Sequence, residues 1–238
     1  MTDRAATSTD RVLTGLVVLA AATCIGTLHV IFFRTPIEAT MGIVQKVFYF
    51  HVPAAYGMYL GAAACFVGSA LYLFRPRDRW DAVARAGAEI AVLMGLMVMI
   101  TGPLWASKAW GRYWTWDPRL TTVLLSLLLY VAYLALRAFG GRGDAERRFA
   151  AALGVLGAAN LPIIHLSVRK WGGQHPQVIT GSGRGLQHPD MKLALGLGFA
   201  TFTLLVVACL AARIRVHRAE CRLAILEQQA LELDLVED

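Results

Sequence analysis

The sequence predicts an all-α integral membrane protein with six transmembrane helices and both termini on the cytoplasmic side. Three observations carry this prediction. The chain of 238 residues is 57% hydrophobic and only 16% charged, which excludes a disordered protein and favours membrane insertion. It contains six apolar stretches near the roughly 20 residues that a helix needs to cross the hydrocarbon core. Finally, lysine and arginine are unequally divided between the two sets of connecting segments.

Short polar or charged segments separate the six apolar stretches. The first stretch follows a polar N-terminus and has no small-residue cleavage site after it, so we expect a retained span and not a removed signal peptide. The second opens with Pro53, which suits the first turn of a helix because proline has no N–H to leave unpaired. The predicted spans are residues 12–33, 52–74, 86–105, 119–139, 149–167 and 191–212.

The connecting segments alternate between the two sides of the membrane. One set of flanks contains fourteen arginines, and the opposite set contains nine lysines and arginines. Because positive residues gather on the cytoplasmic side, the side with fourteen is predicted to be cytoplasmic. The external side then contains the three loops 34–50, 106–120 and 168–190. Nine external cations are many for that side, which suggests an anionic ligand there.

The end of the chain differs in character from the membrane domain of residues 1–212. In the segment 213–238, apolar residues recur every three or four positions among charges, which predicts a cytoplasmic amphipathic helix. Such a tail is either a solvated helix end or a docking surface for a cytoplasmic partner. The four cysteines form no Cys-x-x-Cys motif, so a disulfide framework, a zinc site and a c-type haem attachment site all lack support.

The remaining composition excludes two other classes of protein. The net charge of +7 is accounted for by the loop bias, and no nucleic-acid motif accompanies it, so no nucleic-acid partner is expected. The glycine-rich segment 181–185 is not followed by Gly-Lys-Ser/Thr and is therefore not a phosphate-binding loop. If transport by this system needs ATP, another chain must hydrolyse it.

The second external loop has the most unusual composition in the chain. The candidate site residues in this loop are Trp110, Tyr113, Trp114, Trp116, Asp117 and Arg119, and Trp105 lies just before it. Aromatic faces beside cations suit a large, flat, anionic ligand. Tryptophan and tyrosine also gather at membrane interfaces as anchors, but an anchoring belt does not need Trp-x-Trp-Asp-x-Arg in one loop. Asp117 is expected to hold a loop amide or to pair with Arg119.

Four of the six histidines fall on or near the external face. His51 lies at the mouth of the second span, His165 in the last turns of the fifth, and His175 and His188 in the third external loop. Porphyrin iron takes two axial ligands, and imidazole is a common choice. We expect His51 and His175 as that pair, with the deeper His165 orienting the site or supplying the second ligand instead. A cytochrome with haems inside the bilayer has only His29 and His165 as candidates.

With these residues collected, the chain resembles the haem exporter protein C (CcmC) family of cytochrome c maturation. The resemblance covers roughly residues 40 to 200. Its signature residues are Trp110-Gly111, Trp114, Trp116-Asp117 and Arg119-Leu120-Thr121, flanked by Tyr49-Phe50-His51-Val52-Pro53-Ala54-Ala55 and by Asn160-Leu161-Pro162-Ile163-Ile164-His165, Trp171 and His175. Tyr113 occupies a position that is often tryptophan in the family, and Trp171 lacks an adjacent tryptophan.

The resemblance implies a protein that binds haem b at the outer face of the bacterial inner membrane and delivers it to the haem chaperone CcmE. It implies His51 and His175 as axial ligands and the Trp-rich loop as the platform, in a delivery protein without catalytic residues of its own. Other implied partners are the small membrane subunit CcmD and the ABC transporter subunits CcmA and CcmB. The haem propionates would meet cations chosen from Lys108, Arg112, Arg119 and Arg169.

Three alternatives stay open on the sequence alone. A cytochrome c haem lyase (synthetase) shares the Trp-rich signature, although larger external regions are expected of such an enzyme. A redox cytochrome would need pairs of histidines within the bilayer. A haem-free structural subunit of a transporter would use the aromatic loop only as an interfacial belt.

Overall fold

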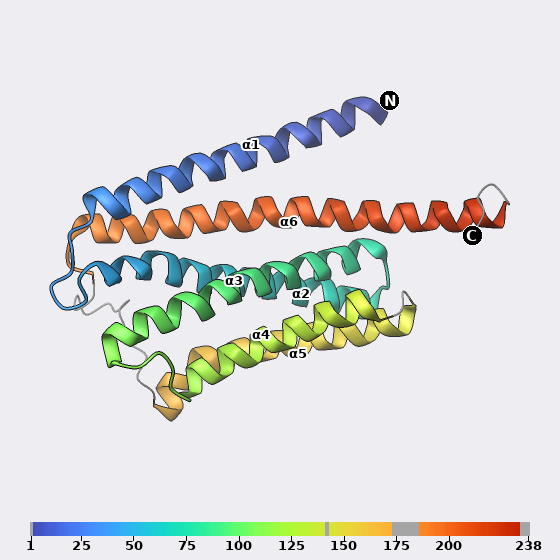
Figure 1. The fold of residues 1–238 in the computed structure, drawn as a ribbon. Coiled ribbons are helices and arrows are strands. Elements are labelled where there is room, and N and C mark those ends of the chain that lie inside the picture. Colours follow the sequence, from blue (N-terminus) through green and yellow to red (C-terminus); the bar gives the residue numbers. More distant parts are fainter. Residues whose placement is uncertain (1, 141–142, 173–185, 234–238) are drawn as a thin grey trace.

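The computed structural model consists of six long helices that run side by side (Figure 1). It describes residues 2–140, 143–172 and 186–233. The helices are α1 (Thr2–His29), α2 (Phe48–Phe74), α3 (Asp78–Trp110), α4 (Pro118–Phe139), α5 (Asp144–Trp171) and α6 (Pro189–Glu232). All 6 are long and apolar enough to cross a membrane, which confirms the predicted six-span, all-α membrane fold.

Both termini lie at the same end of the bundle, as an even number of spans requires (Figure 1). The α2–α3 connection, the end of α4 and the start of α5 also lie at this end (Figure 1). The opposite end, which we call the loop end, contains the α1–α2 and α3–α4 connections together with the end of α5 and the start of α6 (Figure 1). The three segments that the sequence predicts to be external therefore begin and end at one end of the molecule.

Most of the helices extend beyond the apolar stretches that predict them. The helix α6 continues without a break to Glu232, so the predicted amphipathic tail is helical as far as this residue, as an extension of the sixth span. The prediction for Pro53 is wrong. A short 3-10 helix over Ile43–Val47 leads directly into α2 at Phe48, so Pro53 lies inside the helix and not in its first turn.

The contact between α2 and α3 is the most extensive in the bundle, and it is made through glycines. A Cβ atom on Gly87 of α3 would lie 2.3 Å from the backbone nitrogen of Cys65 on α2. A Cβ atom on Gly61 of α2 would lie 2.6 Å from the backbone nitrogen of Ala91 on α3. The two backbones are therefore in direct contact, which is how membrane helices gain packing energy where burial from water contributes little.

Buried polar contacts tie α4 to its neighbours. The amide of Asn160 on α5 donates to the carbonyl oxygen of Thr122 and to the hydroxyl of Ser126 on α4, both at 2.7 Å. The guanidinium of Arg137 on α4 donates to the carboxylate of Asp81 on α3 at 2.7 Å, and both side chains are buried. The Asn160 amide and one nitrogen of the Arg137 guanidinium thus meet acceptors, whereas Nε of Arg137 is buried with no partner among the described residues.

A second charged cluster joins α6 to α3 near the end with the termini. The guanidinium of Arg213 on α6 donates to Glu89 on α3 at 2.8 Å. The buried ring of His217 lies between two carboxylates, with Nε2 3.0 Å from Glu89 and Nδ1 3.1 Å from Glu220. The helix α1 lies next to α6, and a hydrogen bond of 2.8 Å between Thr27 on α1 and Thr201 on α6 links the two.

The α2–α3 contact predicts how two glycine substitutions will differ. Gly87→Ala forces a methyl group against the backbone of Cys65 and should destabilise the fold by about 1–3 kcal/mol, the usual cost of overpacking. Gly196→Ala is the matched control, because nothing lies within 4 Å of a Cβ atom at that helical position. Unfolding of the purified proteins in mixed SDS and detergent micelles measures both. Equal stabilities would contradict the tight contact.

Candidate functional site

The connection between α3 and α4 is shorter than the predicted external loop 106–120. The helix α3 continues through Trp110 and ends at Gly111, whose φ of 69° lies in the left-handed region that favours glycine. The N–H of Gly111 donates to the carbonyl oxygen of Ser107 at 3.1 Å. Trp105 and Trp110 therefore belong to the last turns of a helix, and only residues 111–117 form the connection.

Asp117 builds the start of α4. Its carboxylate accepts the backbone N–H groups of Arg119 and Leu120, both at 2.9 Å, and Pro118 occupies the first helical position. This is an N-cap with proline in the position where its missing N–H is not needed. The expected role of Asp117 in holding a loop amide is confirmed. The cap also fixes the backbone positions of Trp116, just before α4, and of Arg119, in its first turn.

The aromatic residues form two edge-to-face pairs. Trp105 and Trp110 pair at a ring-centroid distance of 5.7 Å, and Trp114 and Trp116 pair at 5.6 Å. Such perpendicular pairs hold each ring in a defined orientation. Trp116 is 75% exposed and Tyr113 is 65% exposed, so the second pair and its neighbour offer ring surface to the outside.

Trp105 also keeps an unused hydrogen-bond donor. Its indole Nε1 is buried and has no partner among the described residues. A buried donor of this kind is costly unless a further group accepts from it. Trp171, at the end of α5, is another exposed ring at the loop end, with 64% of its surface accessible.

His51 lies in the first turn of α2, where three helices converge. Its Nδ1 lies 2.8 Å from the hydroxyl oxygen of Thr101 on α3. The next residue of α3, Gly102, faces the ring, since a Cβ atom there would lie 3.3 Å from Cε1 of His51. Arg119 lies in the first turn of α4, at the same end of the bundle. The structure thus brings together His51 and Arg119, two predicted site residues.

The cations at the loop end are mostly not neutralised by carboxylates. Within the described ranges, Arg34 is the one arginine or lysine there with an ion-pair partner, Asp190 at 2.8 Å. Lys46 is buried and donates to the carbonyl oxygen of Phe32 at 3.0 Å. The arginines near the other end are largely paired: Arg85, Arg137, Arg147, Arg148, Arg213 and Arg215. Exposed Lys108 and Arg112 and half-buried Arg119 leave the loop end attractive to an anion.

Comparison with known proteins identifies the family. A family model described as "Heme exporter protein C" (CcmC) matches residues 2–229. The chain belongs to the haem exporter protein C family. A protein of that name from Rhodobacter capsulatus is 32% identical over 200 residues, which cover 83% of this chain and 83% of the relative. The protein of that name from Escherichia coli K12 is 34% identical over 187 residues, which cover 76% and 73%.

A further relative comes from a plant. A Marchantia polymorpha protein described as "Putative cytochrome c biosynthesis ccmC-like mitochondrial protein" is 32% identical over 168 residues, 70% of this chain and 71% of that protein. The resemblance drawn from the Trp-rich signature is therefore confirmed. Membership in the haem exporter protein C family connects this multi-pass membrane protein to haem handling in cytochrome c maturation.

The other predicted histidines of this family member have different surroundings. His175 lies outside the described residues, and so does the side chain of Arg169. His165 is exposed on α5 and makes no hydrogen bond to any residue in the described ranges. His188 caps α6 by accepting the N–H of Asp190 at 3.2 Å, which is a structural role. His29 stacks on Phe33 with ring centroids 5.3 Å apart.

Two residues beside the site could not be singled out from the sequence of this chain. Thr101 and Gly102 lie inside the apolar stretch of the third span, where a threonine and a glycine are ordinary. No motif marks either of them. Their importance becomes visible only when α2 and α3 are placed side by side, because Thr101 contacts the ring of His51 and a side chain at Gly102 would press against it.

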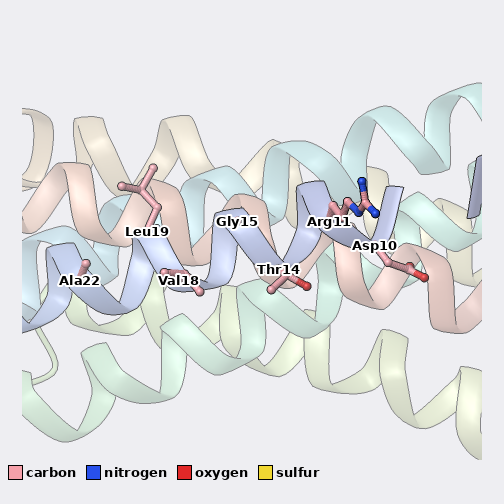
Figure 2. Close-up of a pocket in the computed structure, with 7 residues that line it drawn as sticks. All are labelled: Asp10, Arg11, Thr14, Gly15, Val18, Leu19 and Ala22. Carbon is pink, nitrogen blue, oxygen red and sulfur yellow. The ribbon is translucent and has the colours of Figure 1, made fainter. Parts of the chain in front are cut away.

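A shallow pocket on α1 is unrelated to this site. It is lined by seven residues of α1, namely Asp10, Arg11, Thr14, Gly15, Val18, Leu19 and Ala22 (Figure 2). These residues lie toward the end with the termini, whereas Trp116 and His51 lie at the loop end (Figure 1). The apolar residues that line the pocket face outward from a membrane span, where lipid acyl chains are the ordinary neighbours.

Proposed function

We propose that this chain binds haem b at the outer face of the inner membrane and delivers it to the haem chaperone CcmE during cytochrome c maturation. One observation carries the proposal: His51 at the start of α2, the exposed aromatic segment and Arg119 in the first turn of α4 all lie at the loop end of the bundle. Haem presents an iron atom, a flat apolar ring and two propionates. An imidazole, exposed aromatic rings and cations with no carboxylate partner among the described residues match these three features.

In this proposal His51 supplies one axial ligand to the iron of the bound haem. The second comes from His175, with His165 as the alternative. Membership in the family supports a haem site here, and the sequence pattern supports His175 as the more accessible of the two. A site with two imidazoles holds haem without a permanent covalent bond, so the haem can still leave.

In this proposal the aromatic platform contacts the flat porphyrin ring, and the cations bind the propionates. Tyr113 and the Trp114–Trp116 pair form the platform. Because the two indole planes are perpendicular, one of them lies against the porphyrin face and the other meets it edge-on. Trp105 with Trp110 supports the platform from the end of α3. Arg119 meets a propionate, and Lys108, Arg112 and Arg169 are the other candidates for that role. Asp117 contributes by shaping the connection that orients Trp116 and Arg119.

Delivery requires that part of the haem stays accessible. The high exposure of Trp116 and Tyr113 supports a platform that leaves one haem edge open to a partner. CcmE then captures the haem covalently through a histidine of its own, so this chain assists the reaction and is not a stand-alone enzyme. CcmD and the transporter subunits CcmA and CcmB complete the proposed membrane complex.

Haem retention tests the site directly. We expect His51→Ala to remove or shift the Soret band of protein purified from haem-replete cells. Trp116→Ala removes about 1 kcal/mol of ring contact and should weaken haem retention roughly fivefold. Trp80→Ala is the matched control, because Trp80 stacks on Arg79 at the other end of α3. Absorption spectra and pyridine haemochrome assays measure all three.

The same assay distinguishes the candidate second ligands. A band lost in His51→Ala and His175→Ala but retained in His165→Ala supports the proposed pair. Loss in His165→Ala with retention in His175→Ala would transfer the second ligand to α5. The absence of any band in the unmodified protein, even with added haem, would contradict the haem site and favour a haem-free subunit.

Transfer to the chaperone tests the delivery step. In cells that produce this chain with CcmE, covalent haem on the chaperone should appear, and it should fall at least tenfold with His51→Ala. Haem staining of the chaperone after denaturing gel electrophoresis measures this. Attachment of haem to an apocytochrome c by this chain alone, without the chaperone, would support the lyase alternative instead.

Orientation of the site is tested by labelling. In a Cys221→Ser background the other three cysteines lie within membrane spans, so they contribute little signal. An impermeant thiol reagent applied to intact spheroplasts should label Tyr113→Cys at the loop end and leave Arg77→Cys, in the α2–α3 turn, unlabelled. Labelling of the second variant but not the first would reverse the proposed topology.

A further inference from the structure

We propose that Thr101 is a positioning residue that fixes the tautomer of His51, so that Nδ1 carries the proton and Nε2 offers the free lone pair. The part of the inference that concerns iron rests on the proposed haem function. The part that concerns the imidazole stands on the contacts of α2 with α3 alone. No motif in the sequence and no feature of the family signature contains this threonine.

The hydrogen-bond geometry around Thr101 determines where its proton lies. The hydroxyl oxygen is 2.6 Å from the carbonyl oxygen of Met97 and 2.8 Å from Nδ1 of His51. A carbonyl oxygen can only accept, and a hydroxyl has one proton to donate. Two oxygens this close repel each other unless a proton lies between them, so the hydroxyl proton points to Met97.

The remaining contact must then run in the other direction. With its only proton committed to Met97, the hydroxyl of Thr101 accepts a hydrogen bond, and the donor is the N–H of His51 at Nδ1. In a neutral imidazole, one protonated nitrogen leaves the other as the acceptor. Nε2 of His51 therefore has the lone pair, and no residue in the described ranges hydrogen-bonds to it.

Gly102 leaves room for the same ring. A Cβ atom at this residue would approach Cε1 of His51 to 3.3 Å and Nδ1 to 3.9 Å, so the imidazole occupies space that any other side chain would partly fill. Thr101 and Gly102 are consecutive on α3: the hydroxyl of Thr101 contacts Nδ1, and Gly102 leaves the space beside it open for the ring. Ligand histidines in metal sites are commonly oriented in this way, through the nitrogen that does not bind the metal.

A second threonine whose hydroxyl donates to a carbonyl oxygen of its own helix offers a control. Thr203 of α6 donates its hydroxyl proton to the carbonyl oxygen of Phe199 at 2.7 Å, as Thr101 does to Met97. No histidine contacts Thr203 in the part of the chain that the structure describes. Removing its hydroxyl therefore changes an equivalent helix contact and leaves His51 untouched.

The first experiment is performed on the haem-free full-length protein in detergent micelles. With ¹⁵N-labelled histidine, the nitrogen chemical shifts distinguish a protonated from a bare ring nitrogen, and the spectrum of His51→Ala assigns the signals. We expect Nδ1 protonated and Nε2 bare in the unmodified protein, in Thr101→Ser and in Thr203→Val. Thr101→Val removes the acceptor and should move the ring to the Nε2–H form, which neutral imidazole prefers in water.

The outcomes of this experiment are distinct. A proton on Nε2 in the unmodified protein, in a neutral or a cationic ring, would overturn the inference. It would also fail if Thr101→Val retained the Nδ1–H form. If Thr101→Val does not fold, Thr101→Ala takes its place, and the unmodified and Thr101→Ser spectra still decide the tautomer.

Haem titration connects the tautomer to the proposed function. Loss of a residue that orients a ligand typically costs 10–100-fold in affinity, so Thr101→Val should bind added haem about tenfold more weakly, with Thr101→Ser and Thr203→Val near the unmodified protein. Equal affinity in Thr101→Val would refute the role toward iron. If the unmodified protein binds no haem, the proposed function fails, whereas the nitrogen spectra still decide the role of Thr101.

Discussion

The direct contact between the backbones of α2 and α3 is the constraint on which the site depends. Lipid tails are as apolar as leucine side chains, so the membrane helices gain little from burying apolar surface against each other. Close approach through Gly61 and Gly87 supplies packing energy instead, and it permits almost no sliding. A bulky residue at either position would separate the helices, and a shift along the axis would bring a larger side chain into the gap.

This contact determines which residue of α3 meets His51. Cys65 and His51 are separated by the same number of residues on α2 as Gly87 and Thr101 are on α3. The two helices run in opposite directions, so a contact fixed between Gly87 and Cys65 places Thr101 opposite His51, about 20 Å further along the pair. The fit of the imidazole against Thr101 and Gly102 is thus a consequence of small residues deep in the membrane.

The architecture could be predicted well from the sequence, because the number of spans depends on hydropathy averaged over many residues. Six apolar stretches and the bias of arginine and lysine are properties of many residues, and the six spans agree with the structure. Helix ends depend on single residues and were predicted less well. Trp110 was predicted to be a loop residue because interfacial side chains reduce hydropathy, yet the backbone remains helical until Gly111. Pro53 looked like a helix start, but the preceding 3-10 turn had already started the helix.

The site was predictable to the extent that its chemistry is local. The aromatic cluster, His51 and the capping role of Asp117 can be inferred from neighbours in the sequence, because a cap acts over two or three residues. Thr101 contacts a histidine fifty positions away, and only the register of α2 and α3 brings them together. A change such as Gly87→Ala therefore has a consequence beyond stability. By shifting α3 against α2 it should also disturb the hydrogen bond at His51. The tautomer of the imidazole therefore depends on the helix register that the glycine contact sets.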